Sequence, residues 1–225
     1  MSGRLPTVIF SVVAGMIFFW YAGESVTQPV LAIGPDAEVT GDGLHRLDTS
    51  IMPAAWVSPD LDLSGYNRVF FMPTAVQFRE IPERRYNVRT MEHVTEFRVS
   101  DRRQLRFREL FGESFRDSVG EVESYELSET LGRDVLMVQG ILADVISGVP
   151  PVSVGTSSAI VRMAWEASII LELRDSMSDE VLVRTAFRQR MDGPFDAGLI
   201  VAFTPRVVQG WCRMLIGQLE ELSAL

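Results

Sequence analysis

Two alternating segments give the clearest pattern in the chain. In residues 166–174, and again in residues 181–190, apolar side chains take every second position. This period of two predicts two strands, each with one buried and one solvated face. Residues 175–180 (DSMSDE) between them have turn chemistry and predict a hairpin. Glu–Arg pairs across its open face would add only tenths of a kcal/mol each.

Other apolar segments predict further strands of the same sheet. Residues 67–78 read as a strand whose even-numbered side chains share one face, and Pro73 predicts an edge position or a bulge because it lacks a backbone donor. Residues 134–146 are apolar at consecutive positions and predict a central strand covered on both faces. Residues 125–128 predict a short strand.

Two segments have helical spacing. The first starts at the N-cap Ser100 and ends at Gly120, and the second runs from about Pro205 to Ala224. Each carries one apolar stripe, which predicts the face that packs on the sheet. The stripes consist of Phe107, Leu110, Phe111 and Phe115, and of Val208, Trp211, Cys212, Leu215, Leu219 and Leu222.

These elements predict an α+β fold, with a mixed, mostly antiparallel sheet packed by two main helices in two layers. Residues 56–225 would form one domain. Residues 152–163 are small and polar without a period, so we expect a long loop there, and loops of that length often carry function. A Gly-Pro segment, residues 192–194, follows the hairpin.

The start of the chain predicts a targeting segment. In residues 1–25, Arg4 is the only charged residue that precedes an apolar run of about 16 residues. This arrangement is typical of an export signal. Aromatic residues at positions 18–21 suit a membrane interface and favour an uncleaved anchor, whereas cleavage near Ser25 is the alternative. Residues 26–55 have no period and predict a linker that becomes an extended arm on the domain.

Composition excludes several functions. A net charge of −9 argues against nonspecific nucleic-acid binding, and all 21 basic residues are Arg. The lone Cys212 lies inside a helical stripe and reads as a small buried hydrophobe. With one cysteine and two distant histidines, His45 and His93, we expect no transition-metal site, and no cofactor motif is present.

Candidate chemistry is sparse. No P-loop, HExxH or GxSxG motif occurs. Asp144 lies within an apolar strand, where burial would raise its pKa unless it is paired. The plainer interpretation places it near the strand end, solvated or hydrogen-bonded to the following turn. We therefore expect no enzyme.

Residues 79–103 are rich in arginine and supply the candidate interaction surface. Interleaved acids favour a solvated segment laced with ion pairs, and the alternative is a basic surface facing anionic lipid or an acidic partner. The seven residues are Arg79, Arg84, Arg85, Arg89, Arg98, Arg102 and Arg103.

Several short segments occur in a recognisable order. They are Gly43-Leu44, Leu47 to Ser50, Trp56-Val57 with Pro59, Asp62 to Ser64 with Tyr66, Val69 to Val76, and Leu171 to Val183 with Asp175-Ser176. On these segments the chain resembles, over residues 43–222, a family of bacterial envelope proteins, the domain-of-unknown-function family 3313. It departs from the family pattern where Glu24 replaces the lipid-attachment cysteine, where Ser178-Asp179 replaces a Thr-Gly, and where the arginine-rich insert is longer. The resemblance implies an envelope location and this architecture, but no activity.

Two functions follow as hypotheses. The first is a non-catalytic, exported or membrane-anchored subunit on the periplasmic side, which binds an envelope protein or a second copy. The second is a periplasmic carrier for an apolar, lipid-like ligand. A carrier needs a closed apolar cavity of several hundred Å³, whereas a subunit needs an exposed patch that another chain covers.

Overall fold

The computed structural model describes residues 30–31, 38–48, 54–82, 95–150 and 161–223. They form the strands β1 (Val30–Leu31), β2 (His45–Asp48), β3 (Ala55–Val57), β4 (Arg68–Phe71), β5 (Ala75–Phe78), β6 (Glu126–Leu127), β7 (Val135–Ser147), β8 (Val161–Asp175) and β9 (Val181–Phe195), and the helices α2 (Asp101–Val119) and α3 (Ala197–Leu222).

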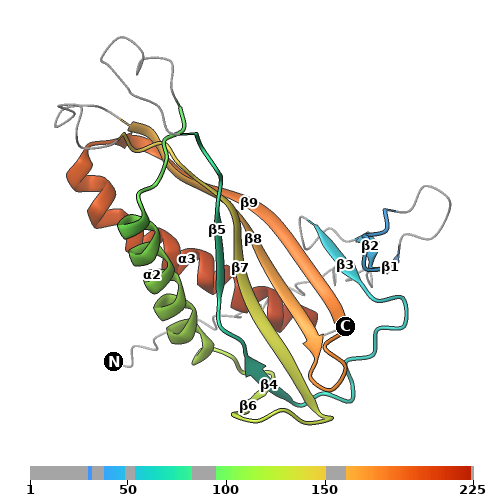
Figure 1. Ribbon diagram of the computed structural model, residues 1–225. Coiled ribbons are helices and arrows are strands. Elements are labelled where there is room, and N and C mark those ends of the chain that lie inside the picture. The colour runs from blue at the N-terminus through green and yellow to red at the C-terminus, as the bar shows by residue number, and fades with distance from the viewer. Residues whose placement is uncertain (1–29, 32–37, 49–53, 83–94, 151–160, 224–225) are drawn as a thin grey trace, which may run out of the picture.

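The strands of the described residues make one sheet in the order β1-β2-β3-β9-β8-β7-β4-β6, with β5 also paired to β7. Pairs that involve β4 or β5 are parallel, and the others are antiparallel. Both helices lie on the same side of the sheet (Figure 1). The predicted α+β fold, with a mostly antiparallel sheet and two helices, is confirmed. The predicted targeting segment lies outside the described residues.

The hairpin of β8 and β9 is the longest part of the sheet. Its predicted inner face is confirmed, since Ile169, Leu171 and Val183 are fully buried. Both strands are longer than predicted, because Val161 pairs with Phe195. Residues 161–163 and 192–194 are therefore strand, so the predicted loop at residues 152–163 is wrong at its end, and residues 152–160 of it lie outside the described residues. The register between β8 and β9 shifts on both sides of Met163, so bulges accommodate the irregular sequence pattern at these strand ends.

Pro73 divides the first predicted strand in two. β4 ends before it and β5 begins after it, and both pair with β7. The prediction of an irregular strand at Pro73 is confirmed, and β5 is an edge strand within the described residues. The predicted single face is wrong, because Val69 and Phe71 face the core before Pro73, whereas Val76 and Phe78 do so after it. The break changes the phase of the alternation by one residue.

β7 is central, as predicted, but helices cover only one of its faces. Leu136 and Val138 pack into the core. On the other face, Met137 is buried beside its cross-strand neighbour Arg174, whose apolar stem can cover it. The predicted coverage of both faces is met at residues 135–138, which are all buried, although the helices lie on one side only. After β7 the chain passes very close to β8, where a Cβ at Gly148 would lie 1.9 Å from the carbonyl oxygen of Met163.

Helix α2 has the predicted bounds, with Ser100 as N-cap and Gly120 as C-cap. Helix α3 begins eight residues earlier than predicted, because the carboxylate of Asp196 accepts a hydrogen bond from the amide of Leu199 at 2.8 Å. Pro205 lies inside the helix rather than at its start. Both predicted stripes face the core.

The predicted arm is extended where the structure describes it. β2 pairs with β3, and β3 pairs with residues 183–185 of β9, so this part of the chain adds strands beside the hairpin. The division of the chain at residues 25 and 55 stays a prediction.

Candidate interaction surfaces

The sheet face turned away from the helices, called the open face below, carries two rows of ion pairs. The first row centres on Glu172, whose side chain is 7% exposed. Its carboxylate accepts from Arg174 at 2.8 Å and from Arg184 at 2.7 Å. Arg184 also binds Asp42 at 2.7 Å. The predicted Glu–Arg pairing is confirmed, but this carboxylate is buried rather than solvated.

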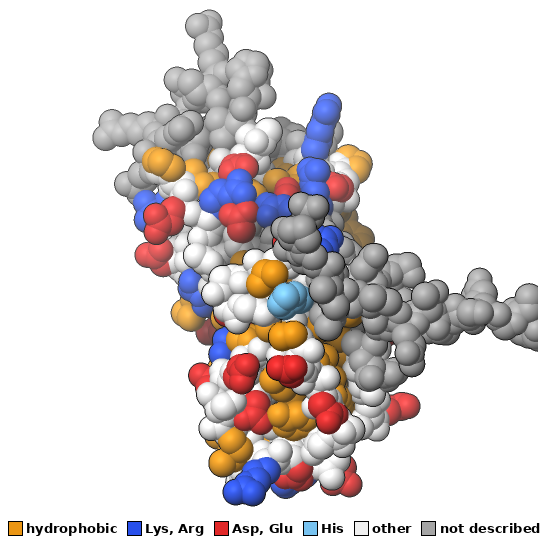
Figure 2. All heavy atoms as spheres, turned by 90° about the vertical axis from the view of Figure 1, so that its right-hand side faces the viewer, with side chains coloured by type: hydrophobic (Ala, Val, Ile, Leu, Met, Phe, Trp, Pro, Cys, Tyr) orange, Lys and Arg blue, Asp and Glu red, His pale blue; other side chains and the backbone are white. Residues whose placement is uncertain are grey.

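The second row crosses four strands near the other end of the open face. Arg190 and Arg188 of β9 bind Glu166 of β8, and Arg188 continues to Asp144 of β7 at 3.0 Å. Arg79, directly after β5, also binds Asp144. Figure 2 shows acidic and basic side chains intermixed at the upper end of this side of the molecule. The alternating signs balance the charges locally.

Asp144 holds this second row together. It lies in the bulge of β7 with φ of +53°, in the left-handed region that few residues other than glycine adopt. Hydrogen bonds from Arg79, assisted by Arg188, hold the pKa of its carboxyl below the usual value. The pairing therefore sets the direction of the shift, as expected for a carboxyl with cationic partners. The residue is partly solvated, as the plainer interpretation had it, but its partners are arginines of neighbouring strands and not the following turn.

These ion pairs predict an acid-sensitive fold. The hydrogen bond from Arg184 lowers the pKa of Asp42 from 3.8 to about 2, and Asp144 is shifted in the same direction. A carboxyl with a lowered folded-state pKa stabilises the fold above its unfolded pKa and loses that contribution as pH falls toward the folded one. We expect the thermal unfolding midpoint to fall between pH 3.8 and about 2. In the Asp42→Asn variant the fall should be smaller, and a midpoint that stays constant over this window would contradict the pairing.

The seven arginines of the candidate surface do not form one patch among the described residues. Arg79 belongs to the second row and also binds Glu96 at 2.9 Å. Arg98 precedes α2 and lines a cleft, while Arg102 and Arg103 lie in the first turn of α2. The others, Arg84, Arg85 and Arg89, lie outside the described residues.

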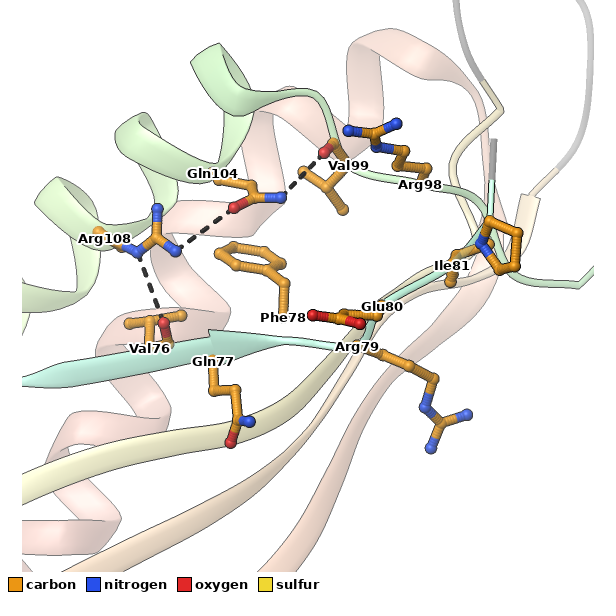
Figure 3. A pocket seen from close by; sticks show the side chains of 11 residues that line it. Val76, Gln77, Phe78, Arg79, Glu80, Ile81, Arg98, Val99, Gln104 and Arg108 are labelled. Atoms are coloured by element: carbon orange, nitrogen blue, oxygen red, sulfur yellow. Dashed lines mark hydrogen bonds between the residues drawn. The ribbon is translucent and has the colours of Figure 1, made fainter. Parts of the chain in front are cut away.

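The cleft lies between the edge strand β5 and the start of α2 and has a volume of about 660 Å³. Figure 3 shows Phe78 and Glu80 on its inner side, while Arg79 points away from it. Arg108 crosses it, donating to the carbonyl oxygen of Val76 at 3.4 Å and to Gln104 at 3.3 Å. The cleft is therefore open and partly polar rather than a closed apolar cavity.

Helix α3 exposes apolar side chains along the face turned away from the core. Leu199, Phe203 and Met214 are exposed there, the last two at 38%. Val201 has the phase of the buried stripe, yet it is 76% exposed. Among the helices of the described residues, Leu199–Leu222 is the one long and apolar enough to cross a membrane, but its buried stripe packs on the sheet.

Sequence reasoning missed this surface. The predicted helix began at Pro205, so Leu199, Val201 and Phe203 were not assigned to any element. Asp196 followed by an apolar segment was the available signal, because an N-cap carboxylate commonly starts a helix. The prediction for Cys212 is confirmed, since it is fully buried and burial raises the pKa of its thiol to about 12.

No protein-family model and no curated protein matches the chain. Among solved structures it is similar to the PelC dodecamer from Paraburkholderia phytofirmans, with 7% identity, a TM-score of 0.33, and coverage of 72% of this chain and 95% of that one. It is also similar to a neuraminyllactose-binding hemagglutinin homologue from Helicobacter pylori, with 9% identity, a TM-score of 0.36, and coverage of 72% and 84%. A protein of family DUF330 from Xanthomonas campestris gives 11% identity, a TM-score of 0.35, and coverage of 72% and 87%.

At these TM-scores the likenesses carry no argument about function. Neither the PelC nor the DUF330 structure is described as a member of family 3313, so that resemblance stays a prediction.

Proposed function

We propose that the protein is a non-catalytic subunit of a cell-envelope assembly, held on the periplasmic side of the membrane by residues 1–25, and that the exposed side of α3 binds its partner. The observation that carries the proposal is the exposure of Leu199, Phe203 and Met214 on one face of α3. Apolar side chains that gather on an exposed surface mark sites that another molecule covers.

Two further observations support a binding role over a catalytic one. Among the described residues, no group of three His, Cys, Asp or Glu side chains is placed to hold a metal ion. The thiol of Cys212 is buried, and its raised pKa keeps it protonated near neutral pH. The carrier alternative is less favoured, because the cleft beside β5 is open and crossed by Arg108.

Native electrophoresis of mildly solubilised membranes tests the proposal. The wild-type chain of 25.2 kDa should migrate in a larger complex. Replacing Leu199, Phe203 and Met214 by Ser should release it as a single chain, since the apolar contact is lost. The matched control replaces by Ser three exposed apolar residues outside α3, namely Leu127 of β6, Leu131 in the segment after it, and Met177 in the turn between β8 and β9.

The control should stay in the complex. Thermal unfolding of both triple variants, followed by circular dichroism, should match the wild type, because all six side chains are solvent-exposed. An α3 variant that folds normally and remains in the same complex would overturn the proposal.

A further inference from the structure

The outer face of α3 has a composition that the fold of a single chain does not explain. Its residues follow one another at spacings of three and four, so they form a single line along the helix. They are Phe203, Arg206, Gly210, Met214, Gly217 and Glu221. Phe203, Arg206, Met214, Gly217 and Glu221 are exposed, and Gly210 is half-buried.

At two of these positions, no contact within the described chain requires glycine. A Cβ added at Gly210 or at Gly217 would have no atom within 4 Å, so nothing in the described chain requires the missing side chain. Each glycine inside a helix is less favourable than alanine, because it gains more freedom in the unfolded chain. Both positions therefore leave room for the close approach of something outside this chain.

The charges on this face are also unpaired. Arg206 lies over the ring of Phe203 at 5.8 Å and forms no ion pair within the described residues. Glu221 likewise has no cationic partner among them. Arg213, beside the line, is held by Glu121 at 3.6 Å. The face thus presents one free cation toward one end and one free anion toward the other.

Four residues of this line are placed symmetrically about the point between Arg213 and Met214. Gly210 and Gly217 lie equally far from that point on either side, and so do Arg206 and Glu221. A helix with this symmetry is complementary to a copy of itself that runs in the opposite direction. Twofold interfaces between identical chains require such self-complementarity. Where one residue of the first copy contacts a second residue of the other copy, the same two residues also meet with the copies exchanged.

We infer that α3 binds the α3 of a second copy of this chain, antiparallel and with a twofold axis between Arg213 and Met214. Each Gly210 then lies against the second copy's Gly217, which lets the two helices approach closely. Each Arg206 reaches the second copy's Glu221, and the two Met214 side chains pack together at the axis. This inference rests on the proposed function, because it names the partner of the same surface.

Charge reversal in the purified protein tests the pairing. Arg206→Glu alone, or Glu221→Arg alone, replaces two attractive pairs by two repulsive ones and should raise the dimer dissociation constant by about tenfold or more. The double variant R206E/E221R restores both pairs in reversed order and should recover dimerisation. Sedimentation equilibrium over a range of concentrations gives the constants, and raised salt should weaken the wild type.

A second variant separates association from folding. Gly210→Ala with Gly217→Ala should raise the thermal midpoint of the monomer, because alanine favours the helix, and yet weaken dimerisation, because two methyl groups enter the contact. A matched charge change on the exposed face of α2, Arg116→Glu, should leave dimerisation unchanged.

The outcomes distinguish this inference from the proposed function. Failure of R206E/E221R to recover a dimer that each single reversal weakens would overturn the register. A wild-type protein that stays monomeric at every concentration would overturn the second copy as partner. If the native complex still depended on Leu199, Phe203 and Met214 in that case, the proposed function would stand with a different protein as partner.

Discussion

Phe111→Ala is expected to lower the free energy of unfolding by about 3–5 kcal/mol. Phe111 is fully buried, and its ring lies 6.1 Å from that of Phe115. Its carbonyl oxygen meets the Sγ of Cys212 at 3.9 Å, so the residue lies where α2 contacts α3. Removing the ring leaves a cavity between the two helices and the sheet, and helices packed on both sides cannot close it without losing other contacts.

Urea denaturation followed by circular dichroism measures this loss. Leu105→Ala on the same helix is the control, because Leu105 is 56% exposed and its truncation should change stability by no more than about 0.5 kcal/mol. The slope of free energy against urea should stay the same in both variants. A Phe111→Ala protein within about 1 kcal/mol of the wild type would mean that α2 does not pack on the sheet through this stripe.

Local signals were sufficient for several elements of the fold. Ser100 and Gly120 mark both ends of α2, and the alternation in residues 166–174 identifies the inner face of β8. In each case the structure depends on residues close in sequence, either through capping or through the period of the strand. Pro73 likewise marked the break between β4 and β5, because a missing backbone donor acts locally.

Features that depend on distant residues could not be predicted. The second ion-pair row joins Arg79 to Asp144 and Arg188, and it exists only because β5 and β8 both flank β7 while β9 lies beyond β8. No local pattern gives that strand order. Nor does a local pattern explain the glycine at position 148, where the chain passes so close to Met163 that a Cβ would collide with it.

The candidate interaction surfaces include features that depend on distant residues and features that depend on a local pattern. The arginine-rich segment was conspicuous in the sequence, yet Arg79 is neutralised by acids far away in the chain. The outer face of α3 was readable, because Phe203, Gly210 and Gly217 recur at intervals of seven. The apolar stripe identifies only the buried face of the helix. The exposure of the opposite face is known only once the packing partner of the helix is known.

The central claim is that another chain covers the outer face of α3 in the envelope. Met214→Cys places a thiol in the middle of this face, and Cys212 does not compete because it is buried and its pKa is about 12. The chain has no lysine, so amine-reactive crosslinkers have few sites, whereas a thiol probe reports on one chosen position. Met177→Cys, in the hairpin turn at the far end, is the control.

The measurement is the rate at which a maleimide labels each thiol, under reducing conditions, in isolated native membranes. Exposure alone, 38% at Met214 against 64% at Met177, would make the two rates differ by less than twofold. If a partner covers α3, labelling at position 214 should be slower than at position 177 by at least about tenfold, which corresponds to a bound fraction near nine-tenths. Equal labelling at the two positions, in a protein that carries all its native partners, would contradict the account.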